Sequence, residues 1–527
     1  MTFLFMELLR SKLEHSQPLL ATLVAVLTLV VLFAWLGDSK ADSHYPLVGP
    51  ELKSPFFFKG IRQRRHWFQQ GPELIHSAFK RFPNVIFTLP SLDRTSIVLP
   101  PRFLQEIREL PASIASNSRA TSDKQFFIGN WTTLDYDIFG HATIDSIKTQ
   151  YIAKIGLQIG RASNEAIYAF NQHFGRYEEW SPIAVQPKIL QLVAQMVGST
   201  IVGPDICRDP DWTPAVIGYA QNVFMAAVTF KLAPDIARPL IALFTPYIYR
   251  IHSCRRTIRR LVGPTIEQKN AWSRDQPQSW KAHVKNDNEI TTLEWLVETS
   301  NPEEATVPMI AHRITGVTFG ATHTTSNTIT NALLDIANDF DRWAPPLRAE
   351  IESVLGETPL TDITNAHLSK MWKLDSFLKE SQRFHPPSML SVNRKMMQSH
   401  ALSSGDVLPK NAHVSFAGVP MSMSDEYISG AEDFDGFRFE HLRRNAETDH
   451  NGLQFTSSYA GSLHFGHGKH MCPGRFMGSL ISKLLLIELL KRYDMKLQDG
   501  GRPKNIMFFD MDIPDPKYEV LFQDRQA

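Results

Sequence analysis

The longest purely apolar stretch of the chain lies close to its N-terminus. Residues 18–36 read PLLATLVAVLTLVVLFAWL and contain no charged side chain. As an α-helix rising about 1.5 Å per residue, this stretch would reach roughly 28 Å, close to the hydrocarbon thickness of a bilayer. Trp35 lies at its end, where interfacial aromatic residues are enriched. The pattern predicts a single transmembrane anchor over residues 18–36, preceded by an N-terminal tail over residues 1–17.

A cleaved signal peptide is the competing interpretation of this stretch. Its apolar region would be shorter and would end at a small-residue cleavage site, so the pattern favours an uncleaved anchor. More basic residues follow the stretch than precede it, which favours a cytosolic position for the rest of the chain. Residues 37–55 contain the segment YPLVGPELKSP, whose prolines and glycine predict a stiff hinge between the anchor and a globular part.

Residues 56–527 show no repeat and no low-complexity tract. Helical periodicity dominates their middle and end, whereas the runs NVIFTLP (84–90) and TSIVLP (95–100) are typical of strands. The polar segment 273–289 predicts a surface loop. We therefore expect one large domain, mainly α-helical with a small β region.

One predicted helix has an interrupted apolar stripe. Asn301, Pro302 and Glu304 predict its start, because they supply a cap, a proline and an acid for the first turn. The stripe, at i+3 and i+4 spacing, consists of Ile310, Ile314, Val317, Ala321 and Thr324. A glycine, a histidine and three threonines then break it in FGATHTT, residues 319–325, although an interior glycine costs about 1 kcal/mol relative to alanine. Taken alone, this interruption favours a kinked packing helix.

Composition excludes several classes of protein. The 527 residues are 43% hydrophobic and 21% charged, which is enough apolar material for a large core. A net charge of +1 argues against a nucleic-acid partner. The three cysteines, Cys207, Cys254 and Cys472, are widely separated and odd in number, so they fit a reducing compartment better than a disulfide framework.

Cys472 lies in an unusual local sequence, HFGHGKHMCPGRF, residues 464–476. No second cysteine is nearby for a disulfide or a short-spaced zinc site. Pro473 suits the first position of a helix, which would place Cys472 at the cap, where backbone N–H groups favour a thiolate. The glycines would let the backbone pass close to a large flat group. A thiolate ligand to haem iron explains these features together, whereas a buried structural cysteine explains none of their clustering.

The same loop carries a family signature. The pattern FxxGx[R/H]xCxG is met by Phe465, Gly468, His470, Cys472 and Gly474. With these residues the sequence resembles the cytochrome P450 superfamily of haem-thiolate monooxygenases. The resemblance implies the cytochrome P450 fold, here preceded by a transmembrane helix, and haem b as cofactor. It also implies that Cys472 is the axial iron ligand, that Phe465 packs near the sulfur and that His470 binds a haem propionate.

Other family elements occur in the expected order. KESQR supplies Glu380 and Arg383, one helical turn apart, and FDGFRF supplies Arg438. Alone, the first two would be an ordinary surface pair. The resemblance, which covers roughly residues 45–520, implies that the three form a Glu–Arg–Arg network behind the haem.

The resemblance also gives the interrupted helix a role. GATHTT is similar to the family's oxygen-activating pattern [A/G]Gx[D/E]T[T/S], with Gly320, Thr324 and Thr325 in place, Ala321 at the glycine position and His323 replacing the acid. Thr324 is thereby implied to hydrogen-bond dioxygen and help deliver protons. A histidine with a near-neutral pKa can relay protons, so His323 is a candidate relay.

Two basic residues are candidates for the haem propionates. The family often has an arginine where Lys148 stands in SIKTQ, and Arg394 in SVNRK is the better candidate. Residues 385–392, HPPSMLSV, are expected to bend back toward the haem and line the substrate pocket.

The resemblance implies a single-pass protein of the endoplasmic reticulum membrane whose catalytic domain faces the cytosol. Electrons would come from NADPH through NADPH-cytochrome P450 reductase, and a cytochrome b-type protein is a further candidate donor. The expected partners are an apolar small-molecule substrate and the lipid bilayer, with no nucleic acid. SLHFGHGKHMCPGRF and KESQRF are most similar to filamentous-fungal members of secondary metabolism, whose substrates are terpenoids, polyketides or indole alkaloids.

Two other functions stay open at this point. The same fold could catalyse desaturation, ring closure or rearrangement instead of hydroxylation or epoxidation, and His323 raises that prospect. A membrane haem protein that binds a ligand without turnover is the non-enzymatic alternative. The presence of Thr324 argues against it, because a passive binder has no need for that hydroxyl.

Overall fold

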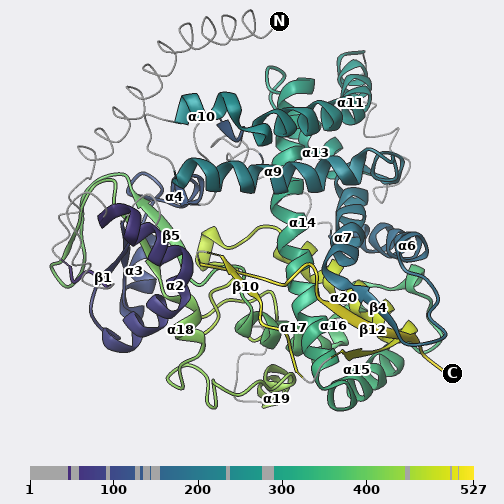
Figure 1. The fold of residues 1–527 in the computed structure, drawn as a ribbon. Coiled ribbons are helices and arrows are strands. Elements are labelled where there is room, and N and C mark those ends of the chain that lie inside the picture. The colour runs from purple at the N-terminus through teal and green to yellow at the C-terminus, as the bar shows by residue number, and fades with distance from the viewer. Residues whose placement is uncertain are drawn as a thin grey trace, which may run out of the picture.

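The computed structural model describes most of the chain beyond the predicted hinge (Figure 1). The described residues are 45–48, 59–90, 95–124, 131–133, 143, 147, 155–232, 238–275, 290–445, 452–498, 501–508 and 510–526. The predicted tail and anchor lie outside them, as does most of the hinge. Within the described ranges, no helix combines the length and apolarity needed to cross a bilayer.

Helices make up most of the described chain, which confirms the prediction of a mainly α-helical fold with a small β region (Figure 1). The α-helices are α2 (Lys59–Arg81), α3 (Leu104–Glu109), α4 (Asn117–Lys124), α6 (Ile155–His173), α7 (Val185–Val202), α8 (Pro204–Cys207), α9 (Trp212–Leu232), α10 (Arg238–Phe244), α11 (Pro246–Asp275), α13 (Thr292–Thr299), α14 (Val307–Asn338), α15 (Phe340–Leu355), α16 (Asn365–Lys370), α17 (Trp372–Phe384), α18 (Gly418–Ser422), α19 (Arg438–Arg444) and α20 (Arg475–Arg492). The 3₁₀ helices are η2 (Pro101–Phe103), η7 (Leu360–Asp362) and η8 (Gly468–His470).

The strands form small sheets of two, three and five members. Their bounds are β1 (Phe87–Pro90), β2 (Thr95–Val98), β3 (Ala115–Ser116), β4 (Ser181–Ala184), β5 (Ser391–Met396), β6 (His400–Ala401), β7 (Val407–Leu408), β8 (His413–Phe416), β9 (Tyr493–Leu497), β10 (Ile506–Phe508), β11 (Met511–Ile513) and β12 (Glu519–Asp524). The largest sheet has the order β1-β2-β8-β5-β3, in which only the β2–β8 pair is parallel. Strands β1 and β2 confirm the strands predicted within 84–90 and 95–100.

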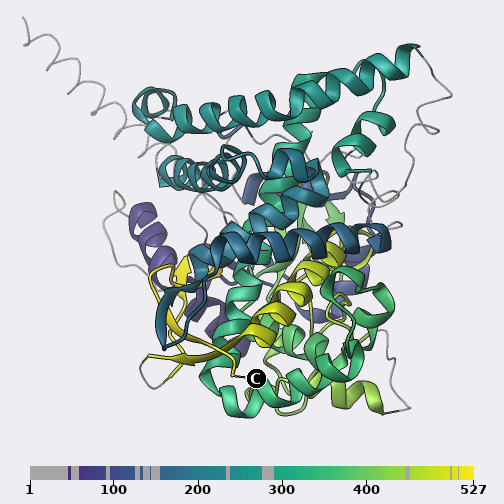
Figure 2. The same cartoon turned by 90° about the vertical axis from the view of Figure 1, so that its right-hand side faces the viewer.

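Helix α14 runs through the middle of the molecule (Figure 1). It packs against α7, α11, α17 and α20, and its Ile310 and Ile314 belong to the main hydrophobic core. Each fully buried side chain of this kind contributes about 1.5–3 kcal/mol, so this core holds α14 rigidly. Figure 2 shows α11, the long teal helix, in a layer above α9 and the rest of the helices.

The predicted start of α14 near Asn301 is wrong. The helix begins at Val307, because the Thr306 hydroxyl accepts the backbone N–H of Met309 and a proline follows in the first turn. Asn301 instead opens a separate turn, in which its carbonyl accepts the N–H of Glu304 at 2.8 Å.

The predicted 273–289 loop and the predicted 37–55 hinge both contain residues with more regular structure than their composition suggested. Helix α11 continues to Asp275, into the predicted 273–289 loop, and residues 276–289 lie outside the described ranges. In the hinge, Val48 donates to the carbonyl of Thr88, and the Thr88 N–H donates to Pro46, both at 2.9 Å. The chain is therefore already paired with β1 before residue 56, where we placed the domain boundary.

Candidate active site

The loop that carries Cys472 is closed by its own backbone. The Cys472 N–H donates to the carbonyl of Phe465 at 2.8 Å, and the Phe465 ring packs edge-on against Phe455 with 5.3 Å between centroids. Helix α20 begins only at Arg475, with Gly474 as its cap. The prediction of Cys472 as the helix cap is therefore wrong by two positions, because Pro473 and Gly474 form a turn before the helix.

The sulfur is subject to two opposing influences. Burial raises the pKa of the Cys472 thiol above its ordinary value, and the N–H groups of Gly474 and Arg475 oppose this rise without cancelling it. The expectation that the helix end alone makes a thiolate is therefore too simple. A cation bound to the sulfur would supply the missing stabilisation, because a metal deprotonates a coordinating thiol.

Gly468 is required by a close approach. Its backbone has φ +67°, a left-handed conformation, and a Cβ built there would lie 2.5 Å from Cγ of Arg108. Gly466 is also left-handed, with φ +76°. The glycines of this loop thus allow a backbone path that other residues would adopt only under strain. His470 lies half-buried in η8, between Gly468 and Cys472.

Helix α14 exposes one narrow face in an otherwise buried stretch. Gly320 and Thr324, four residues apart, are accessible to solvent, whereas Thr318, Thr322 and Ser326 are buried. The Thr324 hydroxyl donates to the Gly320 carbonyl at 2.8 Å. Helix α14 also lies close to α20, because a Cβ atom added at Gly478 of α20 would be 3.7 Å from the hydroxyl oxygen of Thr325. Two elements of the candidate site therefore meet here.

His323 does not share the face of Thr324. Its ring hydrogen-bonds the backbone carbonyl of Ile217 on α9, and its Nε2 is buried without a hydrogen-bond partner in the described structure. Burial lowers the pKa of His323 to about 4, against the opposing effect of that hydrogen bond. The imidazole is therefore neutral at physiological pH.

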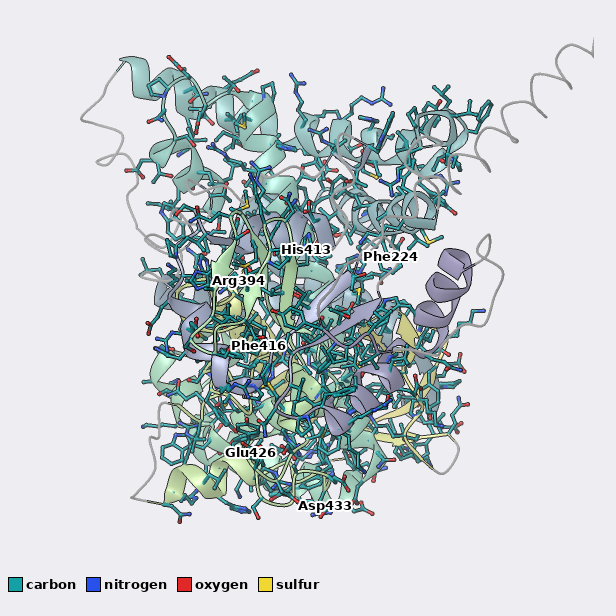
Figure 3. The ribbon with its side chains drawn as sticks, turned by 90° about the vertical axis from the view of Figure 1, so that its left-hand side faces the viewer. Phe224, Arg394, His413, Phe416, Glu426 and Asp433 are labelled. Atoms are coloured by element: carbon teal, nitrogen blue, oxygen red, sulfur yellow. The ribbon has the colours of Figure 1, made fainter. Side chains whose placement is uncertain are left out.

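Arg394 is a buried cation without a carboxylate partner in the described structure. It is 1% exposed, and its Nη1 donates to the Asn117 side chain at 3.2 Å and to the Asn393 carbonyl at 2.9 Å. Its Nε and Nη2 have no partner among the described residues, and burial lowers the pKa of Arg394 to about 10. Figure 3 shows Arg394 near the centre of the molecule, well away from Asp433 at its lower edge. Such a group needs an anion.

Glu380, Arg383 and Arg438 form one buried network. The Glu380 carboxylate accepts from Arg383 Nη2 at 2.7 Å and Nε at 2.9 Å, and from Arg438 Nε at 3.2 Å. Glu380 and Arg383 are fully buried, and the remaining guanidinium donors bind backbone carbonyls, including that of Asp433. The structure thus brings together the three residues that the family resemblance placed in one network. Lys148 lies outside the described residues.

A family model described as Cytochrome P450 matches residues 164–522, well over half of the chain. Cytochrome P450 monooxygenase olcJ of Penicillium canescens is 30% identical over 93% of this chain and 90% of the relative. Cytochrome P450 monooxygenase BOA4 of Botryotinia fuckeliana (strain B05.10) is 30% identical over 99% of each chain. Cytochrome P450 monooxygenase AtmP of Aspergillus flavus is 29% identical over 98% of this chain and 96% of the relative.

The chain belongs to the cytochrome P450 family. Like its relatives, this cytochrome P450 is a monooxygenase, and the family implies a haem cofactor and a redox partner that supplies electrons. The site fits that cofactor in two respects. Cys472 is a free cysteine whose thiolate would be stabilised by a metal cation, and Arg394 is a buried guanidinium with two unused donors that suit a carboxylate.

Sequence reasoning missed three basic residues of this cytochrome P450. Arg475 donates to the Cys472 carbonyl at 2.8 Å, and Arg108 covers Gly468. Lys379 is fully buried and holds the carbonyls of Gln454 and Ser457 at 2.7 and 3.0 Å. Arg475 lies within HFGHGKHMCPGRF, but the family signature gives it no role, whereas nothing in the local sequence around Arg108 or Lys379 indicates these contacts.

Proposed function

We propose that this cytochrome P450 hydroxylates or epoxidises an apolar small molecule in fungal secondary metabolism. The observation that carries the reaction type is the accessible face of α14, where the Thr324 hydroxyl lies one turn from Gly320 beside the start of α20. A hydroxyl on this face can hold a proton at the position where oxygen chemistry needs one. The relatives, all fungal cytochrome P450 monooxygenases, support the biological setting.

Each site residue has a defined task in this proposal. Cys472 would bind the haem iron, while Arg394 and His470 would bind the haem carboxylates. When bound, the haem supplies the activation of dioxygen. Thr324 holds a proton on its hydroxyl, which already donates to the Gly320 carbonyl and needs only a rotation to donate elsewhere. Phe465 orients the cysteine loop through its carbonyl.

Desaturation, ring closure or rearrangement is the second candidate reaction. His323 favours it, because a neutral imidazole bound to the Ile217 carbonyl replaces the acid of the family pattern. A carboxylate there would exchange protons readily, whereas this imidazole has one buried, unused nitrogen.

We also propose that the protein is bound to the endoplasmic reticulum membrane through residues 18–36, with its domain in the cytosol. An exposed apolar patch on α10 and the start of α11 supports contact with a bilayer. Leu243, Phe244 and Tyr249 are 63%, 79% and 60% exposed, and the arginines of α11 that follow, such as Arg256 and Arg259, are exposed as well. Apolar and basic side chains in this order are typical of a membrane-surface segment.

Deletion of residues 1–38 tests the anchor. The variant should move largely into the soluble fraction while its haem spectrum is unchanged. The membrane binding that remains after the deletion should fall further when Leu243→Ser and Phe244→Ser are added to the deletion variant. Loss of haem on deletion would show that the segment belongs to the fold instead.

The reaction is tested in microsomes that contain the full chain, NADPH and NADPH-cytochrome P450 reductase, the electron donor we propose. Apolar terpenoid, polyketide and indole-alkaloid intermediates are supplied, and products are analysed by mass spectrometry. A product heavier by one oxygen atom supports monooxygenation. A product lighter by two hydrogen atoms, or an isomer of the substrate, supports the second candidate, and replacing NADPH by NADH tests the donor.

A further inference from the structure

His385 lies between two carboxylates that come from different parts of the fold. Its Nε2 is 3.5 Å from Asp335 on α14, and its Nδ1 is 3.3 Å from Asp512 on β11. His385 itself follows the last residue of α17. The imidazole therefore joins three elements that are far apart in the sequence.

The charges around His385 balance. The Asp335 oxygen that faces His385, Oδ1, is also paired with Arg502, just before β10, while its Oδ2 accepts the Ser381 hydroxyl at 2.6 Å. Arg502 also donates to the Asn331 side chain of α14 at 2.8 Å. Two carboxylates thus face one guanidinium and one imidazole, so the cluster is neutral only when His385 carries a proton on each ring nitrogen.

The cluster attaches the β10–β11 hairpin to α14. Met511, next to Asp512, packs against the same hydrophobic cluster as Phe319, which directly precedes Gly320. The hairpin is fixed elsewhere by the Met389 N–H, which donates to the Asp510 carbonyl at 2.8 Å. Because Asp512 is the next residue, its link to His385 helps to fix where Met511 packs against the cluster that also contacts Phe319 of α14.

We propose that protonated His385 is a positioning residue that clamps the β10–β11 hairpin against α14 and thereby shapes the substrate side of the active site. A neutral imidazole has one N–H and could donate to only one of the two carboxylates, and its lone pair would face the other. The link to substrate rests on the proposed function, whereas the clamp itself does not.

The pH dependence has a defined sign. Burial opposes the charge, but Asp335 and Asp512 outweigh it and raise the pKa of His385 above its ordinary value; Arg502 acts in the opposite sense. The clamp is therefore intact at low pH and is lost as the pH rises through the raised pKa. Removal of Asp512 should move that loss to lower pH.

The test compares backbone amide exchange of β10 and β11 in the full-length holoprotein and in His385→Gln, at matched pH values. Near pH 6 the hairpin amides should exchange about tenfold faster in the variant, the factor expected when a hydrogen bond to a charged group is lost. The ratio of the exchange rate in the variant to the exchange rate in the wild type should approach one as the pH rises. In Asp512→Asn the hairpin should loosen at lower pH than in wild type, which keeps the test valid if His385→Gln does not fold.

His441→Gln is the matched control, because His441 also lies near carboxylates, Asp435 and Glu440, but is 66% exposed and far from the hairpin in sequence. It should leave the exchange unchanged. The proposal would be overturned if the ratio of the exchange rates in His385→Gln and wild type stayed constant across the pH range. Equal exchange rates in the two proteins near pH 6 would overturn it as well. If the exchange result holds but spectral binding of the bulky azole clotrimazole is unaffected in His385→Gln, the clamp stands and its effect on the substrate side is refuted.

Discussion

The backbone N–H of Cys472 and the carbonyl of Phe465 are joined at 2.8 Å, so the sulfur is positioned by a closed loop as well as by the helix that follows. This explains how one cysteine can lie before the first turn of α20 and still receive the N–H groups of Gly474 and Arg475. The position of the sulfur therefore depends on the glycine-rich loop.

Cys472→Ser should abolish the red-shifted Soret band of the reduced carbon-monoxide complex that gives the family its name. A serine oxygen is a weaker electron donor to iron than a thiolate. Cys207→Ser and Cys254→Ser are the matched controls and should retain the band. Loss of the band in either control, with retention in Cys472→Ser, would refute the ligand assignment.

Arg394→Leu should weaken haem retention, because its two unused donors are the buried groups best suited to an anionic cofactor. Transfer of haem to apomyoglobin should become at least about tenfold faster, in line with the loss of hydrogen bonds to a charged group. Lys395→Leu is the control, since Lys395 follows Arg394 on β5 but is paired with Asp123 at 2.6 Å. Equal haem release in both variants would contradict the role of Arg394.

Glu380→Gln should destabilise the fold by about 3–5 kcal/mol, because it leaves two buried guanidinium groups without their carboxylate. The free energy of unfolding, followed by tryptophan fluorescence in urea, measures the loss. Asp211→Asn breaks the exposed pair with Arg260 and should cost no more than about 1 kcal/mol. Similar losses in the two variants would show that burial of the Glu380 network adds no stability.

Thr324→Ala should leave haem content unchanged but release peroxide in place of product, because the proton-holding hydroxyl is gone. The amount of product per NADPH consumed measures this uncoupling. Thr328→Ala removes the neighbouring hydroxyl, which bonds the Thr324 carbonyl, and should remain coupled.

His323→Ala should slow turnover by removing the imidazole that bonds the Ile217 carbonyl. Burial lowers the pKa of His323 to about 4, so the group is already neutral above that pH. We therefore expect the wild-type rate to show no inflection from this histidine between about pH 5 and 8. An inflection in that range that disappears in His323→Ala would contradict the neutral assignment.

Local patterns predicted the elements that local forces determine. Strands β1 and β2 follow from their local sequence pattern, and the one-turn spacing of Glu380 and Arg383 predicted that they pair, although not that the pair is buried. The start of α14 was wrong because two capping signals compete within a few residues, and the Thr306 hydroxyl is the one that caps the helix. The spacing of residues in the sequence does not decide which of two such capping signals begins the helix.

Contacts between distant segments were beyond sequence reasoning. Arg438 was assigned to the Glu380 network only through the family resemblance. The approach of Arg108 to Gly468 and the position of His385 between Asp335 and Asp512 have no local signal, because tertiary packing brings these segments together. The family's signatures thus predicted the ligand and its network, but not the residues that support them.

The pairing of residues 46–48 with Thr88 fixes the point at which the proposed membrane anchor would be joined to the domain. If residues 18–36 lie in the bilayer, as we propose, nine residues separate Leu36 from Pro46, and the ten Cα–Cα steps between them span at most roughly 36 Å when fully extended. In that arrangement the β1 edge of the sheet would be held on a short tether, so the domain could tilt over the membrane but could not carry that edge far from it. A redox partner diffusing in the same membrane would meet this domain within a narrow range of orientations.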